Sequence, residues 1–136
     1  MGRWRRGHLT YFREVELFEA LKAEYPDLTP LSATDRCDAV THNAFIEIKC
    51  RRKHYDRLMI ERHKWFYLAD IRARTGFRTL YICSTPQGVY EFDLGALNEP
   101  EWVLSLLPTK TDFAGSEMTE KPVGFLHIQD SRLLTI

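Results

Sequence analysis

Two acids and a lysine near the middle of the chain have the types and spacing of a cation-dependent site. Asp38 precedes Glu47, and Lys49 follows Glu47 two positions later. Strand-forming segments flank His42-Asn43, which predicts a two-residue hairpin turn, because Asn tolerates the positive φ that such turns use. This turn would set Asp38 opposite Glu47, with Cβ atoms about 5 Å apart. Two carboxylates in that position repel each other, and a hard divalent cation between them would remove the repulsion.

Strand alternation adds Lys49 to the face of Glu47 and turns Ile46, Ile48 and Cys50 toward the core. The alternative is a surface hairpin whose three charged side chains are exposed and have no role. Two apolar side chains share the charged face, which indicates that this face is also covered.

A third carboxylate, Glu14, is expected on a helix over residues 11–24 that is capped by Thr10 and ended by Pro26. At about 100° per residue, one broad apolar stripe forms on this helix, and Glu14 falls near its middle. The stripe consists of Tyr11, Val15, Leu17, Phe18, Leu21 and Tyr25. A buried carboxylate needs a partner, which is either a metal site or an arginine at the edge of the core.

A second helix is expected over residues 58–75, where Gly76 ends it. Lys64 lies among its apolar residues. Its ammonium either contacts a ligand or extends to solvent while its aliphatic stem packs on the protein.

The order of the elements predicts an α/β fold with a mixed central sheet flanked by helices. The two hairpin strands are expected at 36–41 and 44–50, and later strands at 77–83 and 89–94 around a turn at 86–88. Beyond these, a short helix at 101–107 and a strand at 124–128 are expected. We expect one domain over residues 1–136, with its core at about 10–94 and a C-terminal extension of unassigned role at 95–136.

The 136 residues carry no formal net charge, but seven of the nine charged side chains between Lys49 and Lys64 are cations. Such a patch suits a polyanion, although a solvated helix face has the same composition. No apolar run reaches the roughly 20 residues that span a bilayer, and the N-terminus lacks the apolar stretch of a signal peptide. The three cysteines contain no CxxC pair, which favours free thiols and a cytoplasmic location.

Asp38 followed by Glu47-Ile48-Lys49 resembles the D…(D/E)xK signature of the PD-(D/E)XK nuclease superfamily, with a restriction-endonuclease-like αβββαβ core. Glu14 resembles the N-terminal helical acid seen in Holliday-junction resolvases and phage-type nucleases of that group. Element order extends the resemblance over about residues 10–94. Cys37 occupies the position of the motif proline, which ligates nothing.

The resemblance implies Mg²⁺- or Mn²⁺-dependent hydrolysis of DNA. The metal ligands would be Asp38, Glu47, the Ile48 backbone carbonyl and Glu14, and Lys49 would orient the attacking water. The phosphate-binding residues would be Arg51, Arg52, Lys53, Arg57 and Lys64. It also implies a structure-directed or partner-directed endonuclease that acts on DNA away from membranes, and cutting of both strands would favour a homodimer.

Other functions remain open. A zinc site could use Cys37, His42, Cys50 and His54, but the spacing fits no usual zinc pattern, and both cysteines are expected on the face opposite the acids. A Cys-His catalytic pair has no local support. A non-catalytic nucleic-acid-binding or assembly protein could keep the nuclease fold, although retention of both acids and Lys49 argues against decay.

Overall fold

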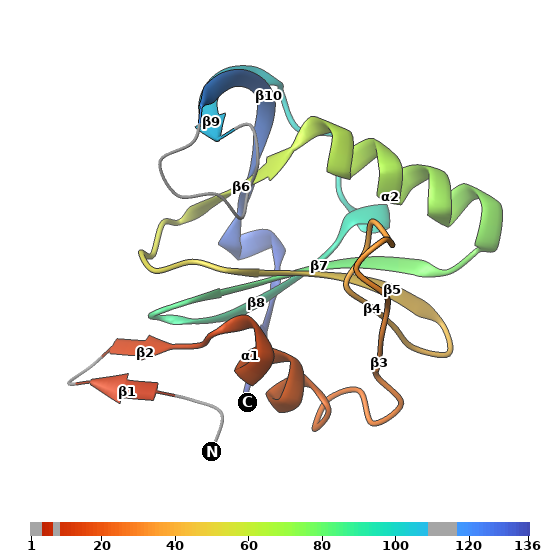
Figure 1. The fold of residues 1–136 in the computed structure, drawn as a ribbon, viewed down its shortest axis with the longest axis vertical. Coiled ribbons are helices and arrows are strands. Elements are labelled where there is room, and N and C mark those ends of the chain that lie inside the picture. The colour runs from red at the N-terminus through yellow and green to blue at the C-terminus, as the bar shows by residue number, and fades with distance from the viewer. Residues whose placement is uncertain (1–3, 7–8, 109–116) are drawn as a thin grey trace.

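A six-stranded mixed sheet separates two helices in this α/β, strand-rich fold (Figure 1). The computed structural model describes residues 4–6, 9–108 and 117–136, with side chains from residue 12 onward. Helix α1 (Glu14–Leu21) lies on one face of the sheet, and helix α2 (Arg62–Thr75) lies on the other. The expected α/β class is therefore confirmed at this level.

The main sheet has the strand order β11-β8-β7-β5-β4-β3. Its strands are β3 (Thr29–Pro30), β4 (Ala39–Val40), β5 (Ala44–Cys50), β7 (Arg78–Thr85), β8 (Gly88–Asp93) and β11 (Arg132–Leu134). β5 and β7 are parallel, and the other neighbours pair antiparallel. Because parallel strands need a crossover, the chain passes through α2 between β5 and β7.

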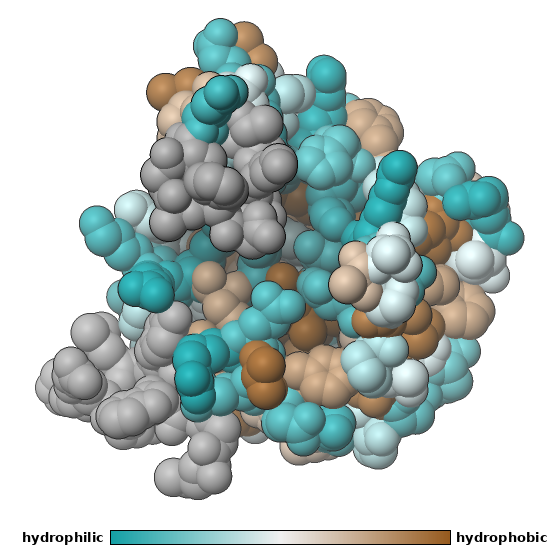
Figure 2. Space-filling view, viewed as in Figure 1, coloured by the Kyte–Doolittle hydropathy of each residue, from teal (hydrophilic) through white to brown (hydrophobic). Residues whose placement is uncertain are grey.

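The face of the molecule that is turned to the viewer in Figure 1 carries both hydrophilic and hydrophobic residues. It is hollowed near its centre, where hydrophobic residues are visible (Figure 2). Neither helix in the described ranges combines the length and the apolar character needed to cross a membrane.

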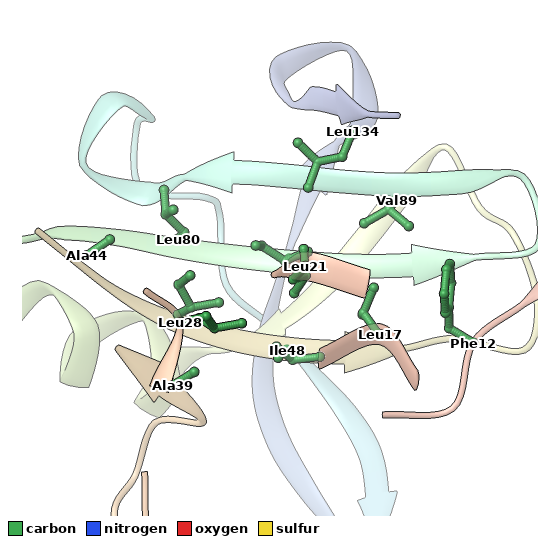
Figure 3. Packing of buried hydrophobic residues seen from close by; sticks show 12 residues of the cluster. Phe12, Leu17, Leu21, Leu28, Ala39, Ala44, Ile48, Leu80, Val89 and Leu134 are labelled. Carbon is green, nitrogen blue, oxygen red and sulfur yellow. The ribbon is translucent and has the colours of Figure 1, made fainter. Parts of the chain in front are cut away.

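Helix α1 packs on the sheet through Leu17 and Leu21, which meet residues of β5, β7, β8 and β11 (Figure 3). The expected start of this helix is wrong. Thr10 belongs to β2 (Leu9–Tyr11), which pairs with β1 (Trp4–Arg6), so the chain is extended where a cap was expected. The N-cap is Arg13, whose N–H donates to the Glu16 carboxylate at 2.9 Å.

Helix α2 begins at Arg62, one turn later than expected, and ends as expected at Gly76, which adopts φ 74°. The four preceding residues belong to β6 (Arg57–Glu61). Leu58 and Ile60 alternate with more exposed neighbours and are buried, which is strand rather than helix periodicity.

Residues beyond Leu94 form strands that pair with the preceding part of the chain. A three-stranded sheet has the order β6-β10-β9, with β9 at Val103–Pro108 and β10 at Met118–His127. The expected helix at 101–107 is wrong because β9 pairs along its length with β10. Short 3₁₀ helices occupy Leu94–Ala96 and Ile128–Asp130, and β11 forms one edge of the main sheet.

Candidate active site

The predicted hairpin register is present between β4 and β5. Val40 pairs with Phe45 and Ala39 with Ile46, so the next step of the register brings Asp38 beside Glu47. The Asp38 N–H donates to the Ile46 carbonyl at 3.2 Å, which holds Asp38 against β5 although it lies just outside β4.

The turn itself differs from the expected one. Among the described residues, only glycine adopts a positive φ, so Asn43 does not use the conformation that was expected of it. Instead, the Asn43 N–H donates to the Thr41 hydroxyl at 3.3 Å. The His42 N–H and ring Nδ1 both contact the Asp27 carboxylate, at 2.7 and 2.8 Å. These contacts stabilise the bend without left-handed backbone.

Glu47 is a buried carboxylate with incomplete neutralisation. Only 8% of the residue is exposed. Burial, followed by the charge of Asp38, raises the pKa of Glu47 to about 7, although Lys64 and Lys49 act in the opposite direction. This carboxylate therefore holds its proton at a higher pH than an ordinary glutamate does.

Lys64 is the ion-pair partner of Glu47, a pairing that the sequence analysis did not predict. Its Nζ lies 3.3 Å from Glu47 Oε1 and donates to the Arg36 carbonyl at 2.5 Å. The ammonium therefore pairs with Glu47 rather than extending to solvent alone, and its contact with a phosphate remains a prediction. Lys64 thus partly compensates the charge of Glu47.

Asp38 is anchored through the backbone of β5. Its Oδ2 accepts a hydrogen bond from the Ile48 N–H at 2.7 Å. The Ile48 side chain is buried in the core, as predicted. The backbone of Ile48 is therefore beside Asp38, and the role of its carbonyl as a metal ligand remains a prediction.

Glu14 approaches the other acids, but not for the predicted reason. It is the first residue of α1 and is exposed, and Val15 beside it is 76% exposed, so the expected buried stripe does not extend over this turn. The helix begins after Tyr11, whose side chain lies outside the described part. Partial burial and the charge of Asp38 raise the pKa of Glu14, whereas Lys49 lowers it.

A groove of about 530 Å³ contains Glu14 and Asp38. It lies between α1 and the segment leading into β4, and Phe18, Leu31 and Ile48 supply apolar parts of its wall. Lys49 lowers the pKa of both Glu14 and Glu47, so its ammonium acts on both acids. The four residues assigned to catalysis are thus electrostatic neighbours, with Asp38 acting on Glu14 and Glu47.

The acids do not form a metal site that is enclosed by protein ligands alone. Within the described residues, no group of three or more His, Cys, Asp and Glu side chains converges closely enough to enclose a metal ion. Mg²⁺ in phosphoryl-transfer sites is commonly held by one or two carboxylates, with water and substrate phosphate completing the shell. Asp38 and Glu47 have the ligand types for such a site, and their role as metal ligands, like that of Glu14, remains a prediction.

The predicted phosphate-binding residues have different surroundings. The Arg51 guanidinium donates to the Met59 carbonyl at 2.9 Å and the Tyr81 hydroxyl at 3.4 Å, so it is partly committed to the fold. Arg52 and Lys53 are exposed. Arg57 is exposed and lies over the Phe125 ring, 5.1 Å from its centroid.

The zinc alternative has no geometric support in the described chain. His42 contacts Asp27, and His54 bonds to Thr85 and Asp56. Cys37 and Cys50 of this proposed zinc site lie in different apolar clusters. Cys50 packs in the core on the α1 side of the sheet, whereas Cys37 packs on the α2 side. The expectation for Cys37 is wrong because it lies in a bend, where strand alternation does not apply.

Cysteine nucleophiles are also disfavoured. Burial raises the pKa of Cys37 and Cys83 to about 12 and that of Cys50 to about 11. Because the thiolate is the reactive form, thiols with such values are poor nucleophiles at neutral pH.

A second buried carboxylate, Glu91 on β8, was not singled out from the sequence. Arg132 donates to its two oxygens at 3.0 and 3.2 Å, and the Tyr25 hydroxyl also donates to it. Arg132 further contacts Glu24 at 3.1 Å. These partners lie 41 to 108 positions from Arg132 in the sequence, so no local pattern could reveal them.

Comparisons with known proteins add no family assignment. No protein-family model matches the chain, and searches of curated proteins and of solved structures give no match.

Proposed function

We propose that the protein is a metal-dependent nuclease that hydrolyses phosphodiester bonds in DNA. The observation that carries the proposal is the pairing of Asp38 with a buried, incompletely neutralised Glu47, beside Lys49. A buried carboxylate whose pKa is raised by a second acid indicates a place for an additional cation.

The arrangement of elements supports the same proposal. α1, the antiparallel strands β3, β4 and β5, the crossover helix α2 and the parallel strand β7 follow one another in the order of an αβββαβ core. β6 is inserted before α2. Glu47 and Lys49 lie on β5 and Asp38 directly precedes β4, a placement that is compatible with the D…ExK resemblance.

In this mechanism Asp38 and Glu47 would hold Mg²⁺ or Mn²⁺, which would supply a Lewis acid for the scissile phosphate and for the attacking water. Lys49 orients that water and offsets the negative charge that develops on the phosphate. Glu14 positions water at the open side of the groove. Because Glu47 must be ionised to bind a cation, metal binding releases a proton near neutral pH.

Lys64 has a positioning role in this proposal. In the described structure its ammonium keeps Glu47 in place, and entry of a divalent cation would weaken the need for that ion pair. The lysine would then be available beside the substrate phosphate, as the family resemblance suggests.

The Glu47–Lys64 contact also favours a second candidate, a nucleic-acid-binding or assembly protein without catalysis. In that case the lysine would be the permanent counter-ion of the glutamate. The two candidates differ in whether a divalent cation competes with Lys64 and whether Lys49 affects hydrolysis.

Digestion of a DNA panel tests the proposal. Linear, nicked, forked and four-way substrates are incubated with the wild type, Lys49→Ala and, as a matched control, Lys22→Ala, in Mg²⁺, Mn²⁺ or EDTA. Lys22 is an exposed lysine that pairs with Glu19 and has no role in the proposed site. We expect cleavage only when a metal is present, and a loss of about 100-fold or more in Lys49→Ala, because removing a group that assists proton transfer has effects of this size. Lys22→Ala should keep the turnover rate. Digestion by Lys49→Ala at the wild-type rate would falsify the assignment.

A further inference from the structure

A second groove, of about 580 Å³, lies between the connection that follows β5 and the small sheet. Its lining combines aromatic, cationic and aliphatic side chains. The residues are Arg51, Tyr55, Asp56, Arg57, Leu58, Met59, Ser105 and Phe125. Tyr55 is 59% exposed and Phe125 is 37% exposed, which makes both rings accessible to a ligand.

The charge of this groove is predominantly positive. Arg57 lies over Phe125, and the buried Nε of Arg51 has no hydrogen-bond partner in the described structure. Asp56 is the acid in the lining, and its carboxylate already accepts from the His54 ring at 3.1 Å. The exposed side chains of Arg52 and Lys53 belong to the same connection. An anion is therefore favoured here.

The connection is held to the main sheet rather than projecting from it. The Arg51 N–H donates to the Ser84 carbonyl at 2.7 Å, which extends the pairing of β5 with β7 by one residue. His54 contacts Thr85 at 2.9 Å and its ring lies 5.8 Å from that of Tyr90. Arg51 follows Lys49 by two residues, about 7 Å along an extended chain. The second groove is thus fixed close to the proposed catalytic lysine.

We propose that this groove binds an unpaired nucleotide of the DNA substrate, with its base against the aromatic lining and its phosphate at Arg51 and Arg57. The proposal rests on the proposed nuclease function and specifies its substrate as DNA with a single-stranded segment next to the cut. Accessible aromatic rings beside cations bind single strands, because every base has a face for stacking and every linkage carries a charge. Bases in an intact duplex are stacked on each other and cannot occupy such a groove.

Binding in EDTA tests the groove without hydrolysis. The probe is a fluorescein-labelled oligothymidylate of about 12 nucleotides, and the competitor is an unlabelled duplex of the same length. The variants are Tyr55→Ala and Phe125→Ala. Phe66→Ala is the matched control, because Phe66 is a 47% exposed aromatic residue of α2 that does not line the groove. Thermal melting of each variant verifies folding.

We expect each groove variant to bind the single strand about tenfold more weakly, since removal of one stacking ring has an effect of this order. Phe66→Ala should bind like the wild type, and Arg57→Gln should reduce the slope of log K against log salt by about one. Wild-type affinity in both folded aromatic variants, or equal competition by the duplex, would overturn the inference.

The two proposals fail separately. If Lys49-dependent cleavage persists while Tyr55→Ala and Phe125→Ala bind normally, the groove assignment is wrong and the nuclease assignment stands. If single-strand binding depends on both rings but no metal supports cleavage, the groove belongs to a binding protein, and the nuclease assignment together with its substrate is overturned.

Discussion

Glu47 and Glu91 are buried glutamates on strands of the same sheet, but the chain neutralises them differently. Glu91 receives two hydrogen bonds from Arg132 and another from the Tyr25 hydroxyl. Glu47 has a single lysine at 3.3 Å and lies in the field of Asp38. The charge of Glu91 is therefore compensated by residues of the protein, whereas that of Glu47 is only partly compensated. This difference is consistent with a purely structural role for Glu91 and with the metal-binding role that we propose for Glu47.

The largest effect on stability is expected on the Glu91 side of the comparison. Arg132→Ala should lower the free energy of unfolding by about 3 kcal/mol, because it leaves a buried carboxylate without its cation. Arg132→Lys is the matched control and should lose less, since a lysine keeps the charge but not the paired geometry. Urea denaturation measures both. A negligible change in Arg132→Ala would mean that Tyr25 alone satisfies Glu91.

The next effect concerns ionisation of Glu47. Its folded-state pKa of about 7 is above the ordinary value of 4.5, so the folded state holds the proton more tightly than the unfolded state. Without metal, the free energy of unfolding should fall by about 3 kcal/mol as pH rises from about 4.5 through 7. Glu47→Gln should reduce this fall and be the more stable protein at pH 8. Urea denaturation in EDTA across this pH range measures the free energy of unfolding of both proteins. If Lys64 fully neutralised Glu47, Glu47→Gln would instead be the less stable protein at pH 8.

Divalent metal should reverse this loss. Mg²⁺ or Mn²⁺ binds the ionised carboxylates, so it should raise the melting temperature of the wild type more at pH 8 than at pH 6. At metal concentrations 100 times the dissociation constant, the gain is about 2.7 kcal/mol. Asp38→Asn and Glu47→Gln should show little of it, whereas Glu91→Gln, although less stable, should keep the metal-dependent increase. Equal increases in all four proteins would show binding elsewhere.

The smallest effect is expected for Glu14. Glu14→Gln removes a carboxylate at the rim of the groove, where solvent can replace a water-mediated contact. We expect a decrease in cleavage rate of about tenfold at most, below the effect of Lys49→Ala. Single-turnover cleavage measures this, with Glu16→Gln on the same turn as control. A loss as large as that of Lys49→Ala would make Glu14 a direct metal ligand.

Local sequence patterns were sufficient for β5 and for the hairpin register, but not for the turn conformation or for β4, which covers Ala39–Val40 rather than the expected 36–41. The alternation of Ala44–Cys50 and the short polar link before it fixed the strand and its register, and Gly76 marked the end of α2. These features depend on neighbouring residues, so they can be predicted from one sequence.

Features that depend on distant pairing could not be predicted in this way. β6 and β9 are stabilised as strands because β10 pairs with both of them. Likewise, Lys64 meets Glu47 only because α2 crosses over the sheet, and Glu14 reaches Asp38 from the first turn of α1 rather than from a buried stripe. Contacts between distant elements, both strand pairing and ion pairing, could therefore not be predicted from local sequence patterns.

The position of Arg132 has a consequence during synthesis of the chain. Glu91 leaves the ribosome 41 residues before its arginine, a delay of about 2–8 s at ordinary translation rates. During that interval the nascent sheet contains a carboxylate without its cation and an outer strand without β11. Final closure of the main sheet must therefore await the synthesis of β11, and until then the outer edge of β8 has no strand partner.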